Sequence, residues 1–288
     1  MSLTLSWIDS HAHLDAAELN TTPGMLQHIR ALARERGVTK CVIPAVCVDN
    51  FERVRELAHQ LDDAYALGIH PLYVPQAEEN DLARLESALD EYRHDPRLVA
   101  VGEIGLDFFV PSLCEPWMRE RQTRFYRAQL AMAQRHGLPV LLHVRRSVDL
   151  VLKYLRQYSP PGGIAHAFNG SEQQAQAFMQ LGVLLGFGGA VTFEGAHRLR
   201  HLVSQLPLSA LVLETDSPDI PPQWLYSTAA QRQQGAAQGI NTPAELPRIA
   251  ETIAALRGIA VHELAFGTTQ NVLRTLKKLG ASSHQLQI

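Results

Sequence analysis

The chain has 288 residues, of which 46% are hydrophobic and 19% are charged, a composition that is typical of folded proteins and excludes wholesale disorder. The formal net charge of -3 gives no general attraction to polyanions, so a nucleic acid would have to be bound by metal ions or a few arginines. Three cysteines without a C-x-x-C spacing argue against a disulfide framework. No apolar run approaches the roughly 18 residues of a membrane helix, so we expect a cytoplasmic protein that does not associate with membranes.

Eight short apolar runs, separated by stretches with helical periodicity, predict eight β-strands. Strands that alternate with helices pair in parallel through right-handed crossovers, and eight such units close into a (β/α)8 barrel of the TIM type. We therefore expect an α/β protein with a single barrel domain over residues 1–288. An open doubly wound sheet is the alternative, but no glycine-rich dinucleotide motif follows the first strand. The predicted strands are Leu5–Ser10, Lys40–Val46, Ala64–Ile69, Leu98–Val101, Pro139–His143, Gly163–His166, Val183–Phe187 and Leu211–Glu214.

Helix signals lie between these strands. Glu115–His136 has an apolar stripe and predicts an amphipathic helix that faces the core. Two further helix starts fit the capping box, Ser171-Glu172-Gln173-Gln174 and Thr242-Pro243-Ala244-Glu245, the second with proline at the first helical position. The stretch 217–239 after the last strand has no clear period, and a connection of this length is more often a functional loop than an accident.

Candidate metal ligands follow five of the predicted strands at their carboxyl ends. In a barrel these ends converge at one mouth, so four histidines and two carboxylates would surround a single point. Each residue alone has a structural explanation, such as a histidine satisfied by a carbonyl group or an aspartate in a turn. Together, without a cation, they would be costly and poorly paired polar groups. The candidates are His11 and His13 after strand one, Glu103 after strand four, His143 in strand five, His166 in strand six and Asp216 after strand eight.

Six ligands are more than one tetrahedral zinc ion needs. The excess favours two divalent ions about 3.5–4 Å apart that share a bridging carboxylate. Mixed nitrogen and oxygen ligation favours Zn²⁺ or Mn²⁺ and also allows Mg²⁺. Such ions would lower the pKa of a bound water and stabilise negative charge on a phosphoryl or carbonyl oxygen, which predicts a hydrolase. Asp216 is placed to accept the proton of that water.

Ordered motifs along nearly the whole chain resemble the TatD family of metal-dependent hydrolases, within the amidohydrolase superfamily, and are most similar to its YjjV-type branch. As an ordered set these motifs are highly specific. They are D-x-H-x-H-L at Asp9–Leu14, G-I-H-P at Gly68–Pro71, G-E-I-G-L-D at Gly102–Asp107, Gln122–Gln129 leading into L-P-V at Leu138–Val140, H-x-R at His143–Arg145, H-x-F-x-G at His166–Gly170, E-T-D-S-P at Glu214–Pro218 and N-x-P at Asn241–Pro243.

The resemblance implies a hydrolase with two divalent metal ions per chain. Characterised family members are deoxyribonucleases, which implies phosphodiester hydrolysis, on single strands or ends of DNA because a barrel mouth is a pocket. His70 and Arg145 would line the site and hold a phosphate. His70 could also be a structural histidine before proline, and Arg145 could simply balance charge. The implied roles are His11 and His13 on one metal, Glu103 bridging, His143 and His166 on the second, and Asp216 completing the first site and acting as base.

Two other functions remain open at the level of the sequence. A small-molecule amidohydrolase, lactonase or phosphoesterase could use the same binuclear site, because one fold supports many substrates. A non-catalytic binding protein stabilised by metal is less favoured, since Asp216 would then have no role. Aromatic residues that could stack bases, or instead act as local packing anchors, are Phe108, Phe109, Trp117 and Trp224.

Overall fold

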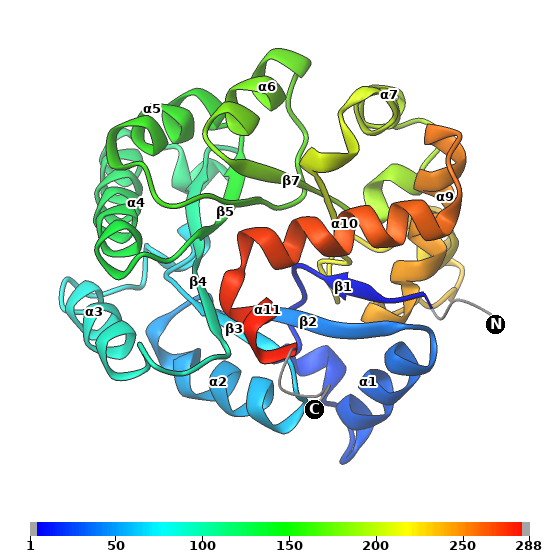
Figure 1. Ribbon diagram of the computed structural model, residues 1–288, viewed down its shortest axis with the longest axis horizontal. Coiled ribbons are helices and arrows are strands. Elements are labelled where there is room, and N and C mark those ends of the chain that lie inside the picture. Colours follow the sequence, from blue (N-terminus) through cyan, green and yellow to red (C-terminus); the bar gives the residue numbers. More distant parts are fainter. Residues whose placement is uncertain (1–4, 284–288) are drawn as a thin grey trace. The chain divides into compact units, whose positions relative to one another are not determined.

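The structure is a computed structural model that describes residues 5–283. Its eight strands form one sheet in the order in which they occur along the chain, and helices connect them (Figure 1). Parallel strands joined in this way define the (β/α)8 barrel, so the predicted fold class is confirmed. The single domain over residues 1–288 stays a prediction, and residues 1–4 and 284–288 lie outside the described part. The strands are β1 (Trp7–Asp9), β2 (Val38–Pro44), β3 (Ala64–Leu67), β4 (Leu98–Asp107), β5 (Val140–Arg145), β6 (Gly163–Ala165), β7 (Val183–Phe187) and β8 (Leu211–Leu213).

The longest helix is α4 (Pro116–His136), which matches the amphipathic segment predicted from the sequence. Proline is favoured in the first helical turn, and the helix ends at Gly137, whose φ of +62° suits a glycine. Its predicted stripe, which includes Phe125 and Leu130, is buried. Across residues 5–283, no helix is long and apolar enough to cross a membrane. The other helices are α1 (Met25–Glu35), α2 (Phe51–Gln60), α3 (Asp81–Glu91), α5 (Val148–Tyr158), α6 (Glu172–Gln180), α7 (His197–Gln205), α8 (Ala229–Gln233), α9 (Leu246–Arg257), α10 (Val261–Thr275) and α11 (Lys277–Ser283).

The described residues group into two compact units, and each is considered by itself. One, the β3–β6 unit, contains residues 43–185 and 272–283. In it the strands β3 to β6 pair in parallel, and α2, α3, α4 and α5 cover their outer side (Figure 1). All residues of β3, β4 and β6 are buried, as expected for parallel strands covered by helices. The core of this unit therefore lies around the strands that carry half of the candidate ligands.

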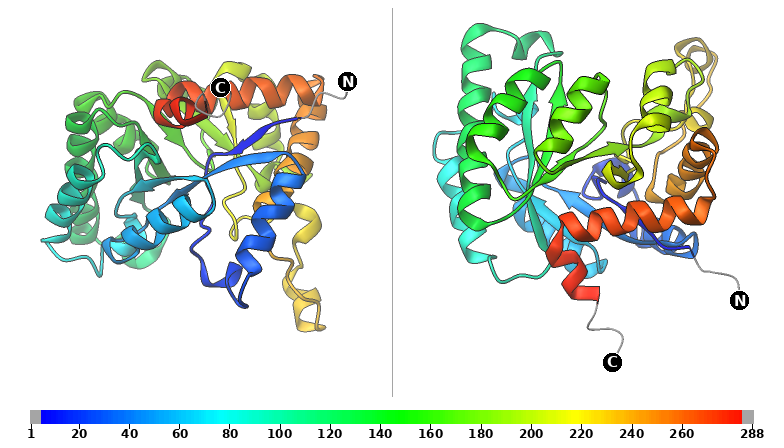
Figure 2. Two further views of the ribbon diagram at one scale, coloured as in Figure 1. Left: turned by 60° about the horizontal axis from the view of Figure 1, so that its bottom comes forward. Right: turned by 45° about the horizontal axis from the view of Figure 1, so that its top comes forward.

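The second, the β1/β8 unit, contains residues 5–42 and 186–271. Here β1 pairs in parallel with β2, and the amide of Ser10 donates to the carbonyl of Leu213, 3.0 Å away, which joins β1 to β8. The stretch 217–239 extends away from these strands (Figure 2). It is not without structure, because it contains α8, whose first turn is capped by Thr228 and Gln231.

Two local predictions need correction. The strand predicted over Leu98–Val101 continues to Asp107, because a bulge after Val101 lets β4 remain paired with β5 as far as Asp107 opposite Arg145. The capping box predicted at Thr242 is wrong, since its side chain makes no capping hydrogen bond. The carboxylate of Glu245, which would have completed it, accepts from the indole Nε1 of Trp224 at 2.6 Å instead.

The other capping box is confirmed. The Ser171 hydroxyl accepts from the Gln174 amide at 3.2 Å, while the Gln174 side chain accepts from the Ser171 amide at 3.0 Å. Two backbone donors at the start of α6 are thereby satisfied.

Asp95 contacts three residues near the amino end of β3. Its Oδ2 lies 2.8 Å from His59 Nε2 and accepts from the Tyr65 hydroxyl at 3.0 Å, and its Oδ1 accepts from the Arg97 amide at 2.9 Å. Burial raises the pKa of Asp95, but these hydrogen bonds lower it by more than burial raises it. The pKa of Asp95 in the folded protein therefore lies below the ordinary value of 3.8. We expect Asp95→Asn to lower the free energy of unfolding at pH 7 by about 1–3 kcal/mol.

The direction in which the stabilisation by Asp95 changes with pH follows from its lowered pKa. Between the folded pKa and 3.8 the unfolded chain binds more protons, so the stabilisation is complete above 3.8 and is lost as the pH falls through the folded pKa. Urea unfolding of wild type and Asp95→Asn at pH 7 and pH 3 measures both differences. An equal difference at the two pH values would contradict the role of the charged carboxylate.

Candidate metal centre

Three of the predicted ligands, His11, His13 and Asp216, form a cluster in the β1/β8 unit. The Nε2 atoms of His11 and His13 lie 3.3 Å apart, and each lies 3.6 Å from Oδ1 of Asp216. The strand β1 ends at Asp9, so both histidines lie beyond it, on a segment that bonds to the chain after β8. The amide of Asp216 donates to the His11 carbonyl at 2.9 Å, and the amide of His13 donates to the Ser217 carbonyl at 2.8 Å. These bonds bring the three side chains together.

The buried carboxylate of Asp9 accepts hydrogen bonds from His11 of this cluster and from Thr215, the residue before Asp216. Oδ1 of Asp9 accepts from the amides of His11 and Thr215, at 3.3 and 3.0 Å, and its Oδ2 accepts from the Thr215 hydroxyl at 2.6 Å. Burial raises the pKa of Asp9 to about 7, although the bonds from Thr215 and His11 and the charge of Arg30 act in the opposite direction. The sequence alone assigned no role to Asp9. Its place as the first residue of the D-x-H-x-H-L motif was the feature of the sequence that could have indicated a role.

The backbone of Asp216 is held in an unusual conformation. Its φ is +54°, in the left-handed region that costs a non-glycine residue roughly 1–2 kcal/mol. The side-chain amide of Asn241 donates to the carbonyls of Thr215 and Asp219, at 2.8 and 2.6 Å, on either side of Asp216. Strain of this kind persists where surrounding contacts fix the backbone, and it is often found at functional sites. Asn241, the asparagine of the late N-x-P motif, is thus a second residue whose role was missed.

The β3–β6 unit contains the other cluster, centred on Glu103. Oε1 of Glu103 lies 3.3 Å from Nε2 of His70, 3.1 Å from Nδ1 of His143 and 2.8 Å from Nε2 of His166. Only 1% of the Glu103 surface is exposed, so the carboxylate depends on these partners for compensation of its charge. Glu103 lies within β4, at the bulge, rather than after the strand. All four residues that the sequence placed at the carboxyl ends of β3, β4, β5 and β6 are therefore brought together here.

The hydrogen bonds of His70 distinguish it from the other two histidines. Its Nδ1 accepts from the amide of Leu72 at 3.1 Å, so in the neutral ring the proton resides on Nε2. That nitrogen faces Glu103 and can donate, but it has no lone pair for a metal. This arrangement agrees with the predicted place of His70 beside the site as a hydrogen-bond donor.

His143 is oriented by a second carboxylate, Asp107. Its Nε2 lies 3.0 Å from Oδ2 of Asp107, which leaves Nδ1 directed toward Glu103. Burial lowers the pKa of His143, but the bonds to Asp107 and Glu103 outweigh burial and raise it. Burial raises the pKa of Asp107, but His143 and the amides of Phe109 and Val110 lower it to about 2. A carboxylate on the outer nitrogen of a histidine is the usual support of a metal ligand, and Asp107 closes the G-E-I-G-L-D motif.

Two buried glutamines on α4 fix the chain at this cluster. Gln129 accepts from the amide of Ile69 at 2.7 Å and donates to its carbonyl at 3.1 Å, next to His70. Gln122 accepts from the amide of Asp107 at 2.9 Å. The sequence analysis quoted both residues in a motif without a role, and only the fold shows that they satisfy strand ends.

The donor atoms of the two clusters fit divalent metal ions. His11, His13 and Asp216 direct ligand atoms within 4.8 Å of one another, and Oε1 of Glu103 lies 3.1 Å from Nδ1 of His143 and 2.8 Å from Nε2 of His166. Imidazole nitrogens mixed with carboxylate oxygens suit Zn²⁺ and Mn²⁺. Such a set of buried polar groups is better compensated by a cation than by its own hydrogen bonds.

Comparisons with known proteins agree with this chemistry. The family model described as TatD related DNase matches residues 8–277. The Escherichia coli (strain K12) protein named uncharacterized metal-dependent hydrolase YjjV is 40% identical over 217 residues, which cover 75% of this chain and 80% of that protein. The crystal structure of YjjV, a TatD homolog from Escherichia coli K12, matches with a TM-score of 0.83 and 34% identity, covering 94% of this chain and 98% of the other. The Mus musculus protein named putative deoxyribonuclease TATDN3 is 29% identical over 297 residues, 98% of this chain and 94% of the relative.

A (β/α)8 barrel with two clusters of histidine and carboxylate ligands defines a metal-dependent hydrolase. The chain belongs to the TatD family, because the family model spans most of its length and the E. coli relative exceeds 30% identity. The resemblance noted in the sequence is thereby confirmed, including its similarity to the YjjV branch.

Substitution of Asp107 tests the cluster centred on Glu103 without changing any of the proposed metal ligands. We expect Asp107→Asn to weaken metal binding about 10–100-fold, because the amide no longer holds the proton of His143 on its outer nitrogen. Equilibrium dialysis against Zn²⁺ or Mn²⁺ measures the affinity, and thermal unfolding shows that the fold is retained. Asp149→Asn, which alters an exposed carboxylate on α5, is the control. Equal affinities of the two variants would show that Asp107 has no part in metal binding.

Proposed function

We propose that the protein is a metal-dependent deoxyribonuclease that hydrolyses phosphodiester bonds in single-stranded DNA or at DNA ends. The observation that carries this proposal is the meeting of a buried carboxylate, Glu103, with three histidine nitrogens at the carboxyl ends of neighbouring strands. Its substrate class rests on the family, whose model is described as TatD related DNase, and on the relative named putative deoxyribonuclease. A barrel mouth accommodates a strand or an end more readily than a long duplex.

Each candidate residue has a role in this proposal. Two divalent ions are bound per chain, and Glu103 is a ligand of both. His11, His13 and Asp216 hold one ion, and His143 and His166 hold the other.

When bound, the metal ions supply Lewis acidity, which makes water a better nucleophile near neutral pH and neutralises charge on the phosphoryl group. Asp216 accepts the proton that the attacking water loses, because its carboxylate lies at the edge of the first cluster. When Glu103 serves as a metal ligand, the hydrogen on Nε2 of His70 is available to a phosphoryl oxygen on which negative charge develops. Arg145 binds a substrate phosphate, since guanidinium groups match phosphate oxygens in geometry and charge.

Asp216→Asn tests the proposed base. We expect the variant to keep much of its metal but to lose at least about 100-fold in kcat, the lower range for a general base. Hydrolysis of a short, end-labelled single-stranded DNA with Mg²⁺, Mn²⁺ or Zn²⁺ measures the rate, and elemental analysis measures the metal. Asp219→Asn, which keeps the backbone carbonyl that Asn241 bonds, is the matched control. Full activity of Asp216→Asn would remove the base role.

Glu103→Gln tests the bridging carboxylate. An amide cannot bridge two cations, so we expect metal content to fall from two ions toward one or none. Elemental analysis after dialysis measures the stoichiometry, with the exposed Glu115→Gln as control. Two ions retained by Glu103→Gln would contradict the assignment. If wild type leaves DNA intact but hydrolyses a small phosphoester, lactone or amide, the ligands stand and the substrate class is wrong.

A further inference from the structure

Two consecutive arginines and a phenylalanine form a small cationic platform next to the Glu103 cluster. The guanidinium carbon of Arg145 lies 3.7 Å from the ring centroid of Phe109, and that of Arg146 lies 4.6 Å from the same centroid. Phe109 is 43% exposed and the Arg145 side chain is 48% exposed, so the stack faces solvent. We call Phe109, Arg145 and Arg146 the arginine platform.

The backbone explains why both arginines reach one ring. Consecutive residues of a strand point to opposite faces, and Arg145 is the last residue of β5. The next residue, Arg146, has a φ of +55°, a left-handed conformation that non-glycine residues rarely adopt. This turn allows the two guanidinium groups to lie over the same ring. Backbone strain of this kind is often found at functional sites.

Asp107 contacts both the arginine platform and the candidate metal centre. Oδ2 of Asp107 lies 3.0 Å from His143 and 3.9 Å from Nη1 of Arg145, while its Oδ1 accepts from the amide of Phe109 at 2.8 Å. Residues 143 and 145 are two positions apart on β5, a separation of about 6.6 Å along a strand. That distance is comparable to the spacing of neighbouring phosphates in an extended single strand of DNA.

The charge of the platform is largely unpaired. Arg145 has only the long contact to Asp107, and Arg146 has no hydrogen bond or ion pair with any residue that the structure describes. A guanidinium stacked on an aromatic ring keeps its N–H donors directed outward in its own plane, which suits a phosphate. Because both arginines lie over Phe109, this ring holds the cations rather than a base.

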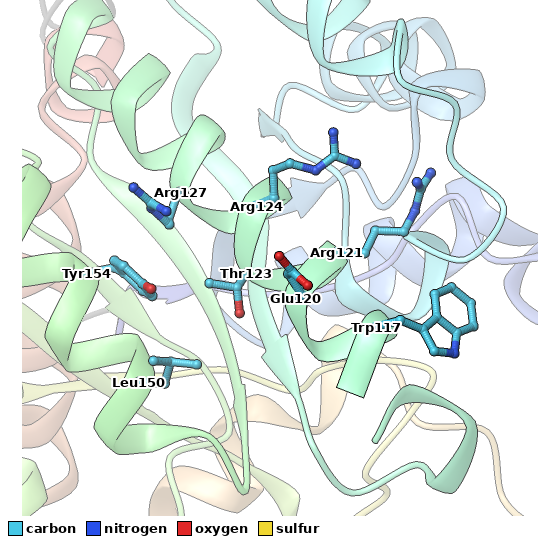
Figure 3. Close-up of a pocket in the computed structure, with 8 residues that line it drawn as sticks. All are labelled: Trp117, Glu120, Arg121, Thr123, Arg124, Arg127, Leu150 and Tyr154. Atoms are coloured by element: carbon cyan, nitrogen blue, oxygen red, sulfur yellow. The ribbon is translucent and has the colours of Figure 1, made fainter. Parts of the chain in front are cut away.

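Several other arginines of the β3–β6 unit are engaged by neighbouring groups. A groove of about 610 Å³ between α4 and α5 is lined by several of them (Figure 3). Arg121 and Arg124 both bond to Glu79 there, and Arg127 bonds to the Tyr158 hydroxyl at 3.3 Å. Arg124 is 52% exposed, close to the value for Arg145, and so provides a matched control.

We propose that the arginine platform binds the phosphate next to the one being hydrolysed, so that the enzyme prefers single-stranded DNA with two or more phosphodiester linkages. This inference rests on the proposed nuclease function and extends it. It assigns Arg146 and Phe109 a part in substrate binding. It also predicts that a diester with a single phosphate is a poor substrate, because the platform then has nothing to bind.

Binding without turnover tests the platform directly. Fluorescence anisotropy of 5′-fluorescein-labelled dT6, with EDTA present, gives Kd for wild type, Arg145→Ala, Arg146→Gly, Phe109→Leu and Arg124→Ala. We expect Arg145→Ala and Arg146→Gly each to weaken binding about tenfold and to reduce the slope of log K against log salt concentration by about 0.7. Phe109→Leu should weaken binding less, and Arg124→Ala should match wild type. Arg146→Gly, which relieves the left-handed strain, should keep a Tm equal to or above that of wild type.

Turnover with Mn²⁺ separates this inference from the proposed function. The ratio of kcat/KM for dT6 to that for bis(4-nitrophenyl) phosphate should fall in Arg146→Gly relative to Arg124→Ala. DNA cleavage by wild type, combined with equal Kd and salt slopes in Arg146→Gly and Arg124→Ala, would overturn the platform and leave the nuclease intact. Absence of DNA cleavage by wild type would overturn the proposed function, and the role of the platform with it.

Discussion

The burial of the Glu103 carboxylate is the constraint on which the rest of the β3–β6 unit depends. A charge that is removed from water needs opposite charge or donors around it, and Glu103 is surrounded by three imidazoles. To bring them close, the backbone of β4 must approach β5 tightly. A Cβ on Gly105 would lie 1.9 Å from the carbonyl oxygen of His143, and its φ of +152° also excludes other residues. The two glycines that flank Glu103 in the sequence thus serve the packing of the site.

Around the two clusters, several buried polar side chains bond to the backbone. Asp9 holds the amides of His11 and Thr215, and Gln129 holds both backbone groups of Ile69. Each such group would cost about 1–3 kcal/mol if it were left unpaired, so these residues stabilise strand ends that cannot be satisfied by the sheet. They also fix where the neighbouring histidines lie. Stability and the geometry of the site are therefore maintained by the same hydrogen bonds.

The sequence predicted the barrel, and it singled out residues that the structure brings together within each unit, because both follow from short-range patterns. Alternating apolar runs mark strands, and polar residues at their carboxyl ends meet at one side of a barrel. Long-range partners are not encoded in this way. Nothing local to Asp107 shows that it holds His143, 36 positions later, and nothing near Glu245 shows that Trp224 will occupy its carboxylate. The bulge that extends β4 also depends on pairing with β5, which periodicity alone cannot show.

A chain with a net charge of -3 can bind a polyanion only where its positive charge is concentrated and unpaired. Some of its exposed arginines are balanced by neighbouring carboxylates, as Arg124 is by Glu79. A left-handed backbone holds Arg146 over the ring of Phe109, and it forms no ion pair with any carboxylate among the described residues. Natural selection for stability alone would favour glycine at such a position. The phosphate that we propose as its ligand would explain why an arginine stands there.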